Sequence, residues 1–305
     1  GRLPSVTPPP MALPVLIVLS AQSQIPKTIE IAPGVIMPYI NLGGVHSKPS
    51  NYSAWIELGG TGLDSALMYG DDIQLDVGDA VKASGIPREN LFITSKVPCC
   101  PSNFSKWCDW YAQEYDDVDA SKRAAIDARL LGVEYVDLML LHWPCTTIED
   151  TIASYRALEE FALAGKARAI GISNFNASAI NDLFAAGPMR VPPSINQCGF
   201  SIGNHNMSLY GRDYDTVAKC LEKKITYSAY SPLGGLSDVD VLSNPTVIAI
   251  GEAHNKSSAQ VALRWLTQQQ IVPVTASSTP SHLSGDLQIF DFTLTKDEMA
   301  ALTKI

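Results

Sequence analysis

The chain has 305 residues, of which 46% are hydrophobic and 17% are charged, a composition typical of a soluble globular protein. Its formal net charge of −9 argues against a nucleic-acid partner, because phosphate binding requires clustered Lys and Arg. No apolar stretch approaches the roughly 20 residues that cross a bilayer, so we expect no membrane span.

Residues 1–27 are predicted to be an extension that precedes one folded domain of residues 28–305. The stretch "GRLPSVTPPP" is Pro-rich, and "MALPVLIVLSAQSQ" resembles the apolar region of a signal peptide but lacks a basic segment before it. We therefore favour an irregular extension and a cytoplasmic protein. A secretory route stays open because of the apolar segment and five Asn-x-Ser sequons, at Asn51, Asn103, Asn176, Asn206 and Asn255.

From residue 28 onward, short apolar runs alternate with amphipathic helical segments. Residues 28–40 predict a hairpin that turns at Pro33-Gly34. Eight strands are then predicted, at residues 40–44, 62–67, 91–97, 136–143, 167–173, 194–200, 225–230 and 271–277. Helical patterns lie between strands, for example at residues 120–132, 147–165 and 215–224.

Strands that are apolar nearly throughout and alternate with helices are typical of a parallel sheet covered by helices. Eight such units favour an α/β fold of the (β/α)₈ TIM-barrel type, here with an amino-terminal β-hairpin cap and long βα loops. An open Rossmann sheet is disfavoured, because no Gly-x-Gly-x-x-Gly follows the first strand.

Polar side chains end most of the predicted strands, and in such barrels the chemistry lies at the carboxyl ends of the strands. A lysine there, Lys96, costs free energy unless its ammonium is paired, and Asp64 on the neighbouring strand is the natural partner. The ammonium is expected to lower the pKa of Tyr69 from about 10, because positive charge favours the phenolate. Tyr69 would then be the general acid of a carbonyl reduction, with His142 orienting the carbonyl.

Several segments closely resemble the aldo-keto reductase family, in family order from about residue 28 to the end. They are "GLDSALMYGDD", "FITSKV", "GVEYVDLMLLHWP", "GKARAIGISNF", "INQCGF", "AYSPLGG" and "SSAQVALRWL…VPVTASSTPSHL…FDFTLTKDEM". The resemblance implies a (β/α)₈ reductase that uses a nicotinamide dinucleotide without a Rossmann domain. It implies a small-molecule carbonyl substrate, and we expect a monomer without a metal.

The resemblance also implies a role for each matched residue. Asp64, Tyr69, Lys96 and His142 would form the catalytic tetrad. Ser173, Asn174 and Gln197 would bind the carboxamide, Tyr230 would stack on the nicotinamide, and Ser231, Leu233 and Gly234 would line the pyrophosphate. Further cofactor contacts are expected at Gly43, Gly44, Asp64, Thr275, Ser277, Ser278, His282 and Asp286. The substrate pocket is expected to include Tyr69, His142, Trp143, Trp107 and Trp110.

The chain departs from the family where the adenosine 2′-phosphate is usually held. Val274, His282 and Asp286 stand at positions that typically carry Lys, Arg and Asn. Cationic contacts are thus missing, although nearby hydroxyl groups and His282 could still donate hydrogen bonds. NADPH is expected as the cofactor, with NADH as a competitor. The loop after residue 233 is short, which predicts an open cofactor groove, and Gly43-Gly44-Val45 lacks a pocket wall common in the family.

Two further alternatives depend on the cysteines and on the overall role. Cys99, Cys100, Cys108 and Cys145 lie in two connecting segments; we favour free thiols, with a bridge from Cys99 or Cys100 to Cys108 as the alternative. A non-catalytic binding or assembly subunit that keeps the fold and the cofactor site is the alternative to an enzyme. The complete tetrad favours the enzyme.

Overall fold

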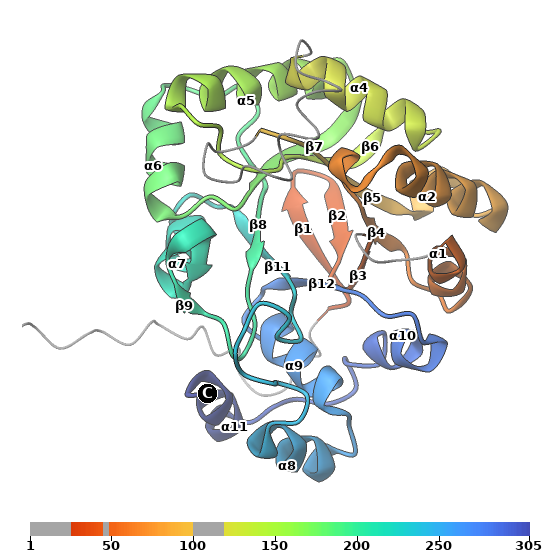
Figure 1. Ribbon diagram of the computed structural model, residues 1–305, viewed down its shortest axis with the longest axis vertical. Helices are drawn as coiled ribbons and strands as arrows, with labels where there is room; N and C mark the ends of the chain where they lie inside the picture. Colours follow the sequence, from red (N-terminus) through yellow and green to blue (C-terminus); the bar gives the residue numbers. More distant parts are fainter. Residues whose placement is uncertain (1–25, 45–48, 100–118) are drawn as a thin grey trace, which may run out of the picture.

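The computed structural model describes residues 26–44, 49–99 and 119–305, and its centre is a closed barrel of eight parallel strands (Figure 1). The strands follow the order β11-β12-β3-β4-β5-β6-β7-β8 around the barrel. Their bounds are β3 (Asn41–Gly43), β4 (Gly62–Asp64), β5 (Phe92–Val97), β6 (Val136–Leu141), β7 (Ala167–Ser173), β8 (Ile195–Gly199), β11 (Thr226–Tyr230) and β12 (Val272–Thr275). The predicted (β/α)₈ barrel is confirmed.

Helices surround the barrel (Figure 1). They are α1 (Pro49–Glu57), α2 (Asp71–Ser84), α4 (Ala120–Leu130), α5 (Ile148–Leu163), α6 (Ala177–Ala185), α7 (Tyr214–Glu222), α8 (Pro245–His254), α9 (Ser258–Thr267), α10 (Pro280–Asp286) and α11 (Lys296–Thr303). Many begin at a side chain that accepts a backbone N–H: Asp119 caps α4, Thr147 caps α5 and Asp213 caps α7. Each such cap contributes about 0.5–2 kcal/mol and defines where the chain turns from loop to helix.

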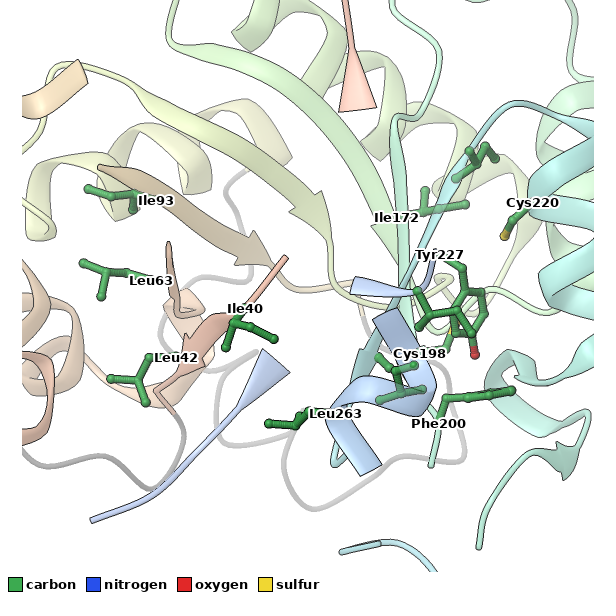
Figure 2. Packing of buried hydrophobic residues seen from close by; sticks show 14 of the residues in the cluster. Ile40, Leu42, Leu63, Ile93, Ile172, Cys198, Phe200, Cys220, Tyr227 and Leu263 are labelled. Carbon is green, nitrogen blue, oxygen red and sulfur yellow. The ribbon is translucent and has the colours of Figure 1, made fainter. Parts of the chain in front are cut away.

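The core has two layers, because successive strand residues face opposite sides of the barrel wall. One set, which includes Leu42, Leu63, Ile93, Ile172 and Tyr227, packs between the strands and the helices (Figure 2). The other set faces the barrel interior. This alternation also decides which polar residues of a strand can reach the mouth of the barrel.

A hairpin of β1 (Thr28–Ala32) and β2 (Val35–Pro38) closes the amino-terminal end of the barrel. Gly34 at its turn has a φ of 72°, a conformation that glycine adopts without strain. Apolar residues of the hairpin, such as Val35 and Met37, pack in one buried cluster with Phe92 and Ile195, the first residues of their strands. The predicted hairpin is confirmed, whereas the boundary of the extension stays a prediction because residues 1–25 lie outside the described residues.

The structure corrects the expectation for the cysteines. A disulfide joins Cys99, which follows β5, to Cys145, which follows β6, with their Cα atoms 4.8 Å apart. The expectation of free thiols is therefore wrong for these two residues, and Cys99 has no capacity left for Cys108. The physical reason is that adjacent parallel strands bring their following loops together, although 46 residues separate the two cysteines. Cys100 and Cys108 lie outside the described residues.

Two smaller findings bear on the expected setting of the protein. In the described part of the chain, every helix is too short or too polar to cross a bilayer. Of the sequons, Asn51 is only 6% exposed, and Asn176 uses its side chain to cap α6. The buried side chain of Asn51 is not available to solvent, which weakens the argument from sequon number.

Candidate active site

Four polar side chains meet at the carboxyl end of the barrel. Asp64 is the last residue of β4, Lys96 lies near the end of β5, and His142 follows β6. Tyr69 ends a 3₁₀ turn, Leu67–Tyr69, in the loop after β4. Lys96 Nζ donates to Asp64 Oδ1 over 2.6 Å and lies 5.3 Å from the centroid of the Tyr69 ring, and the Tyr69 and His142 rings are 6.0 Å apart.

The Asp64–Lys96 ion pair is buried and held from several sides. Lys96 Nζ also donates to the backbone oxygen of Ser65 over 2.8 Å, and Gln197 Nε2 donates to the second carboxylate oxygen of Asp64 over 2.8 Å. Burial alone would lower the pKa of Lys96, but Asp64 and Tyr69 outweigh it, so the pKa is raised. The ammonium therefore stays charged at neutral pH.

The expected direction of the Tyr69 pKa is wrong. Burial of the phenol raises its pKa above 10, although the charge of Lys96 and its hydrogen bond act in the opposite direction. The sequence shows the neighbouring cation but not the loss of water around the hydroxyl, which is the larger effect here. At neutral pH Tyr69 therefore carries its proton.

His142 is held in the neutral form. Burial and the nearby charge of Lys96 lower the pKa of its imidazole well below 6.5. Its Nδ1 is buried with no hydrogen-bond partner among the described residues, and its ring stacks on Trp143 at a centroid distance of 6.1 Å. Trp143 in turn meets the edge of Tyr210 at 4.9 Å. An aromatic wall thus lies beside a neutral histidine at the site mouth.

A sealed polar network lies behind Lys96. Gln74 of α2 accepts from Ser65 and donates to Asp127 of α4 and to Ser95 of β5. Burial raises the pKa of Asp127 to about 7, against the opposing effects of hydrogen bonds from Ser95 and Gln74 and of the charge on Lys96. This network fixes the residues on either side of the ion pair, Ser65 next to Asp64 and Ser95 next to Lys96.

A second row of polar groups crosses the mouth toward β11. Ser173 Oγ donates to the backbone oxygen of Gln197 over 2.7 Å, and Asn174 Nδ2 donates to the backbone oxygen of His142 over 3.0 Å. The hydroxyl of Tyr230 donates to Asn174 Oδ1 over 2.8 Å. The residues expected to bind a nicotinamide carboxamide therefore lie together and next to the tetrad.

The remaining expected cofactor residues border this row. Ser231 has a φ of 52° and its backbone oxygen accepts from Gly234 N over 3.2 Å, which turns the chain sharply after β11; Leu233 is partly buried against the core. A Cβ on Gly44 would crowd the hydroxyl of Tyr52 and the backbone oxygen of Asp64, and one on Gly43 would lie 3.1 Å from Val274. Both glycines thus allow close packing at the end of β3.

The region after β12 differs from the tetrad in exposure. Thr275 Oγ1 donates to Asp286 Oδ2 over 2.8 Å, and burial raises the pKa of Asp286 to about 6. Ser277 Oγ lies 3.5 Å from Nδ1 of His282, and both Ser278 and His282 are exposed. Asp286 therefore points into the protein, toward Thr275. Trp107 and Trp110, expected in the substrate pocket, lie outside the described residues.

Sequence reasoning missed three features of this site. The contact of Gln197 with Asp64, the Gln74–Asp127 contact and the contact of Arg212 with Tyr230 each join residues that are far apart in the chain. The local signal was a polar residue on the otherwise apolar buried face of a helix, as at Asp127. Among the described residues, no group of three or more His, Cys, Asp or Glu side chains could hold a metal ion.

Comparison with known proteins relates this chain to one family. A family model described as the aldo/keto reductase family matches residues 51–305. A morphine 6-dehydrogenase from Pseudomonas putida is 32% identical over 91% of this chain and 90% of the relative. An aldo-keto reductase from Mycolicibacterium vanbaalenii is 35% identical over 87% of each protein. The crystal structure of a Bombyx mori aldo-keto reductase in complex with NADP is 27% identical, with a TM-score of 0.75 over 93% of each chain.

Proposed function

The chain belongs to the aldo/keto reductase family, and on that premise we propose that it reduces an aldehyde or ketone to an alcohol with NADPH as the hydride donor. Tyr69 is the general acid. The observation that carries the proposal is the buried ion pair of Lys96 and Asp64, whose ammonium lies beside the ring of Tyr69. A structural ion pair would not need a tyrosine and a neutral histidine aimed at the same open end of a barrel.

Each member of the tetrad has a distinct task in this proposal. His142, neutral because its pKa is lowered, donates a hydrogen bond to the carbonyl oxygen and orients it. Tyr69 gives its proton to that oxygen as the carbon gains a hydride, which completes the alcohol. Lys96 stabilises Tyr69 as the phenolate that remains after the proton transfer, and Asp64 keeps Lys96 in place and charged. Solvent then restores the proton of Tyr69.

The residues beside the tetrad fit a nicotinamide dinucleotide. When bound, a reduced nicotinamide supplies the hydride. Gln197 uses Nε2 for Asp64, and no described residue bonds its Oε1, which is therefore available to accept from a carboxamide. Ser173 and Asn174 lie next to it, and Tyr230 offers a ring at the adjacent strand end. Support for NADPH comes from the family and from the NADP complex of the Bombyx mori relative; NADH is the competing cofactor because no Lys or Arg stands at Val274, His282 or Asp286.

The test combines binding and turnover. Quenching of tryptophan fluorescence measures the dissociation constants of NADPH and NADH, and oxidation of the cofactor is followed with an aromatic aldehyde as a generic substrate. Tyr69→Phe removes the proton donor and little else, so we expect kcat to fall by about 10²–10⁴-fold while cofactor affinity stays nearly constant. Tyr135→Phe is the matched control, because Tyr135 precedes β6 at the opposite end of the barrel.

Two outcomes would contradict the proposal. Tyr69→Phe that keeps most of the wild-type kcat would exclude Tyr69 as the acid. A wild-type protein that binds cofactor tightly yet turns over no aldehyde or ketone from a broad panel would favour the non-catalytic alternative.

A further inference from the structure

Arg212 places a positive charge next to Tyr230. It lies in the two-residue strand β10 (Arg212–Asp213), which pairs with β9 (Asn206–Met207) in the segment between β8 and α7. Its Nη2 donates to the hydroxyl of Tyr230 over 3.1 Å. The guanidinium carbon also lies 5.7 Å from the centroid of the Tyr210 ring. The guanidinium therefore sits between two tyrosines at the mouth of the barrel.

Gly199 makes room for this guanidinium. It is the last residue of β8 and pairs with Tyr230 across the sheet. A Cβ at position 199 would lie 2.8 Å from Cδ1 of Leu236, 3.0 Å from Nε of Arg212 and 3.3 Å from Cε2 of Tyr230. The space that a side chain on β8 would fill is thus taken by Arg212, which the neighbouring segment supplies.

The charge on Arg212 has no counter-ion in the described part of the chain. Its Nε is buried without a hydrogen-bond partner, and none of the described carboxylates lies within ion-pair distance of it. The adjacent Asp213 accepts from Thr216 N at the start of α7. Burial raises the pKa of Tyr230 to about 12 despite the opposing effect of Arg212, so the hydroxyl that meets the guanidinium is neutral.

An unpaired, partly desolvated cation is costly, and a guanidinium does not lose its proton to avoid that cost. A fixed positive charge beside a binding site acts on the charge of the ligand that binds there. Arg212 contacts the hydroxyl of Tyr230 and the ring of Tyr210, so if Tyr230 stacks on the nicotinamide, the guanidinium neighbours the residue that this cofactor ring contacts. The nicotinamide ring changes its charge in the reaction, because it is neutral when reduced and cationic when oxidised.

We propose that Arg212 sets the preference of this protein between the two redox forms of its dinucleotide, by weakening the binding of the oxidised form through charge repulsion. The inference rests on the proposed function, because it requires that Tyr230 stacks on a nicotinamide. Repulsion between two like charges in a partly buried site changes a dissociation constant by about three- to tenfold. The oxidised cofactor, which is the product of the reaction, consequently dissociates more readily than the reduced cofactor.

The experiment measures dissociation constants and does not depend on turnover. Tryptophan fluorescence gives the values for NADP⁺ and NADPH, and for NAD⁺ and NADH, with the wild type, Arg212→Gln and Arg212→Lys. We expect Arg212→Gln to tighten the oxidised form about three- to tenfold relative to the reduced form. Arg212→Lys keeps the charge and should keep the wild-type ratio. If Arg212→Gln misfolds, Arg212→Met is measured in its place, because it also lacks the charge.

The possible failures are distinguishable. A ratio of oxidised to reduced affinity that is the same in Arg212→Gln, Arg212→Met and the wild type would overturn this inference while leaving the proposed function intact. Equal weakening of both forms would also overturn it, because Arg212 would then only support the ring of Tyr230. A wild-type protein that binds neither dinucleotide would overturn the proposed function, and this inference with it. As a further check, Tyr230→Phe breaks the hydrogen bond but not the charge, so it should retain the wild-type ratio.

Discussion

The two sides of the barrel mouth are built differently. On the β4–β6 side, Lys96 is fully buried, its partner Asp64 is 2% exposed, and Gln74 and Asp127 behind them are fully buried. On the side after β12, Ser278 and His282 are exposed, and Ser277 makes one long contact of 3.5 Å with His282. One side holds charges in a sealed environment, and the other offers hydroxyl groups to water.

This difference separates chemistry from cofactor choice. In a sealed environment a charge can change neither its position nor its protonation without cost, so substitutions there should alter rate and stability strongly. At an exposed site water competes for each hydrogen bond, so substitutions should alter affinity modestly. We propose that the first side performs the reaction and that the second determines which dinucleotide is preferred.

The largest expected effect is that of Lys96→Met. Loss of the ammonium should lower kcat by about 10²–10⁴-fold, and the alkaline limit of the rate profile should move to higher pH, because Tyr69 loses the charge that opposes the rise of its pKa. The unpaired Asp64 left behind should also cost about 3–5 kcal/mol of stability. The double variant Lys96→Met/Asp64→Asn removes that cost and serves as the control. An unchanged alkaline limit in both variants would mean that Lys96 is only structural.

Asp127→Asn should change how stability depends on pH. The pKa of Asp127 is about 7 in the folded protein, above the usual 3.8, so between about pH 4 and 7 the folded state keeps a proton that the unfolded chain releases. The free energy of unfolding therefore falls as pH rises through this window, by up to about 4 kcal/mol. Urea unfolding at pH 5 and pH 8 should show this fall reduced in Asp127→Asn. The exposed Asp182→Asn is the control, and equal falls in both variants would exclude the assigned pKa.

Cys145→Ser tests whether the disulfide between the segments that follow β5 and β6 stabilises the fold. The disulfide closes a loop with a sequence separation of 46, so its removal should cost about 2–4 kcal/mol of unfolding free energy. Cys99→Ser and the double variant should lose the same amount, because each already breaks the single link. If the losses of the two single variants add up in the double variant, the cysteines act independently and the disulfide does not form in solution.

The smallest expected effect is on cofactor affinity at the end of β12, where Val274 is 6% exposed and borders the exposed side. Val274→Lys supplies a cation where the family typically has one, and a charge-assisted hydrogen bond to a phosphate should tighten NADPH about tenfold while leaving NADH unchanged. Val274→Met has a similar length without the charge and is the control. A wild-type preference for NADPH beyond about a thousandfold, with no gain from the lysine, would show that the phosphate lies elsewhere.

The sequence predicted the parts of this site that depend on local pattern. Asp64, Lys96 and His142 each follow or end an apolar run, and parallel strands bring such ends to one rim. The burial and the protonation states of these side chains could not be predicted from the sequence to the same extent. The direction of the Tyr69 pKa was wrong because burial outweighs the effect of Lys96, and no run of residues shows how much water a folded loop excludes.

Contacts between distant segments could not be predicted. Gln74 and Asp127 are 53 positions apart and on different helices, and Cys99 reaches Cys145 only because β5 and β6 are neighbours. Arg212 illustrates the same point, since its place depends on the absence of a side chain at Gly199 on another strand. Sequence pattern indicates which residues face the barrel mouth, whereas the partners of each residue follow from packing.

The hairpin of β1 and β2 determines from which end of the barrel solvent and product reach or leave Tyr69. Its apolar side chains pack against the first residues of the barrel strands and close that end, so solvent meets Tyr69 from the open rim. Under the proposed function, the outgoing alcohol and the proton that returns to Tyr69 therefore pass the same rim.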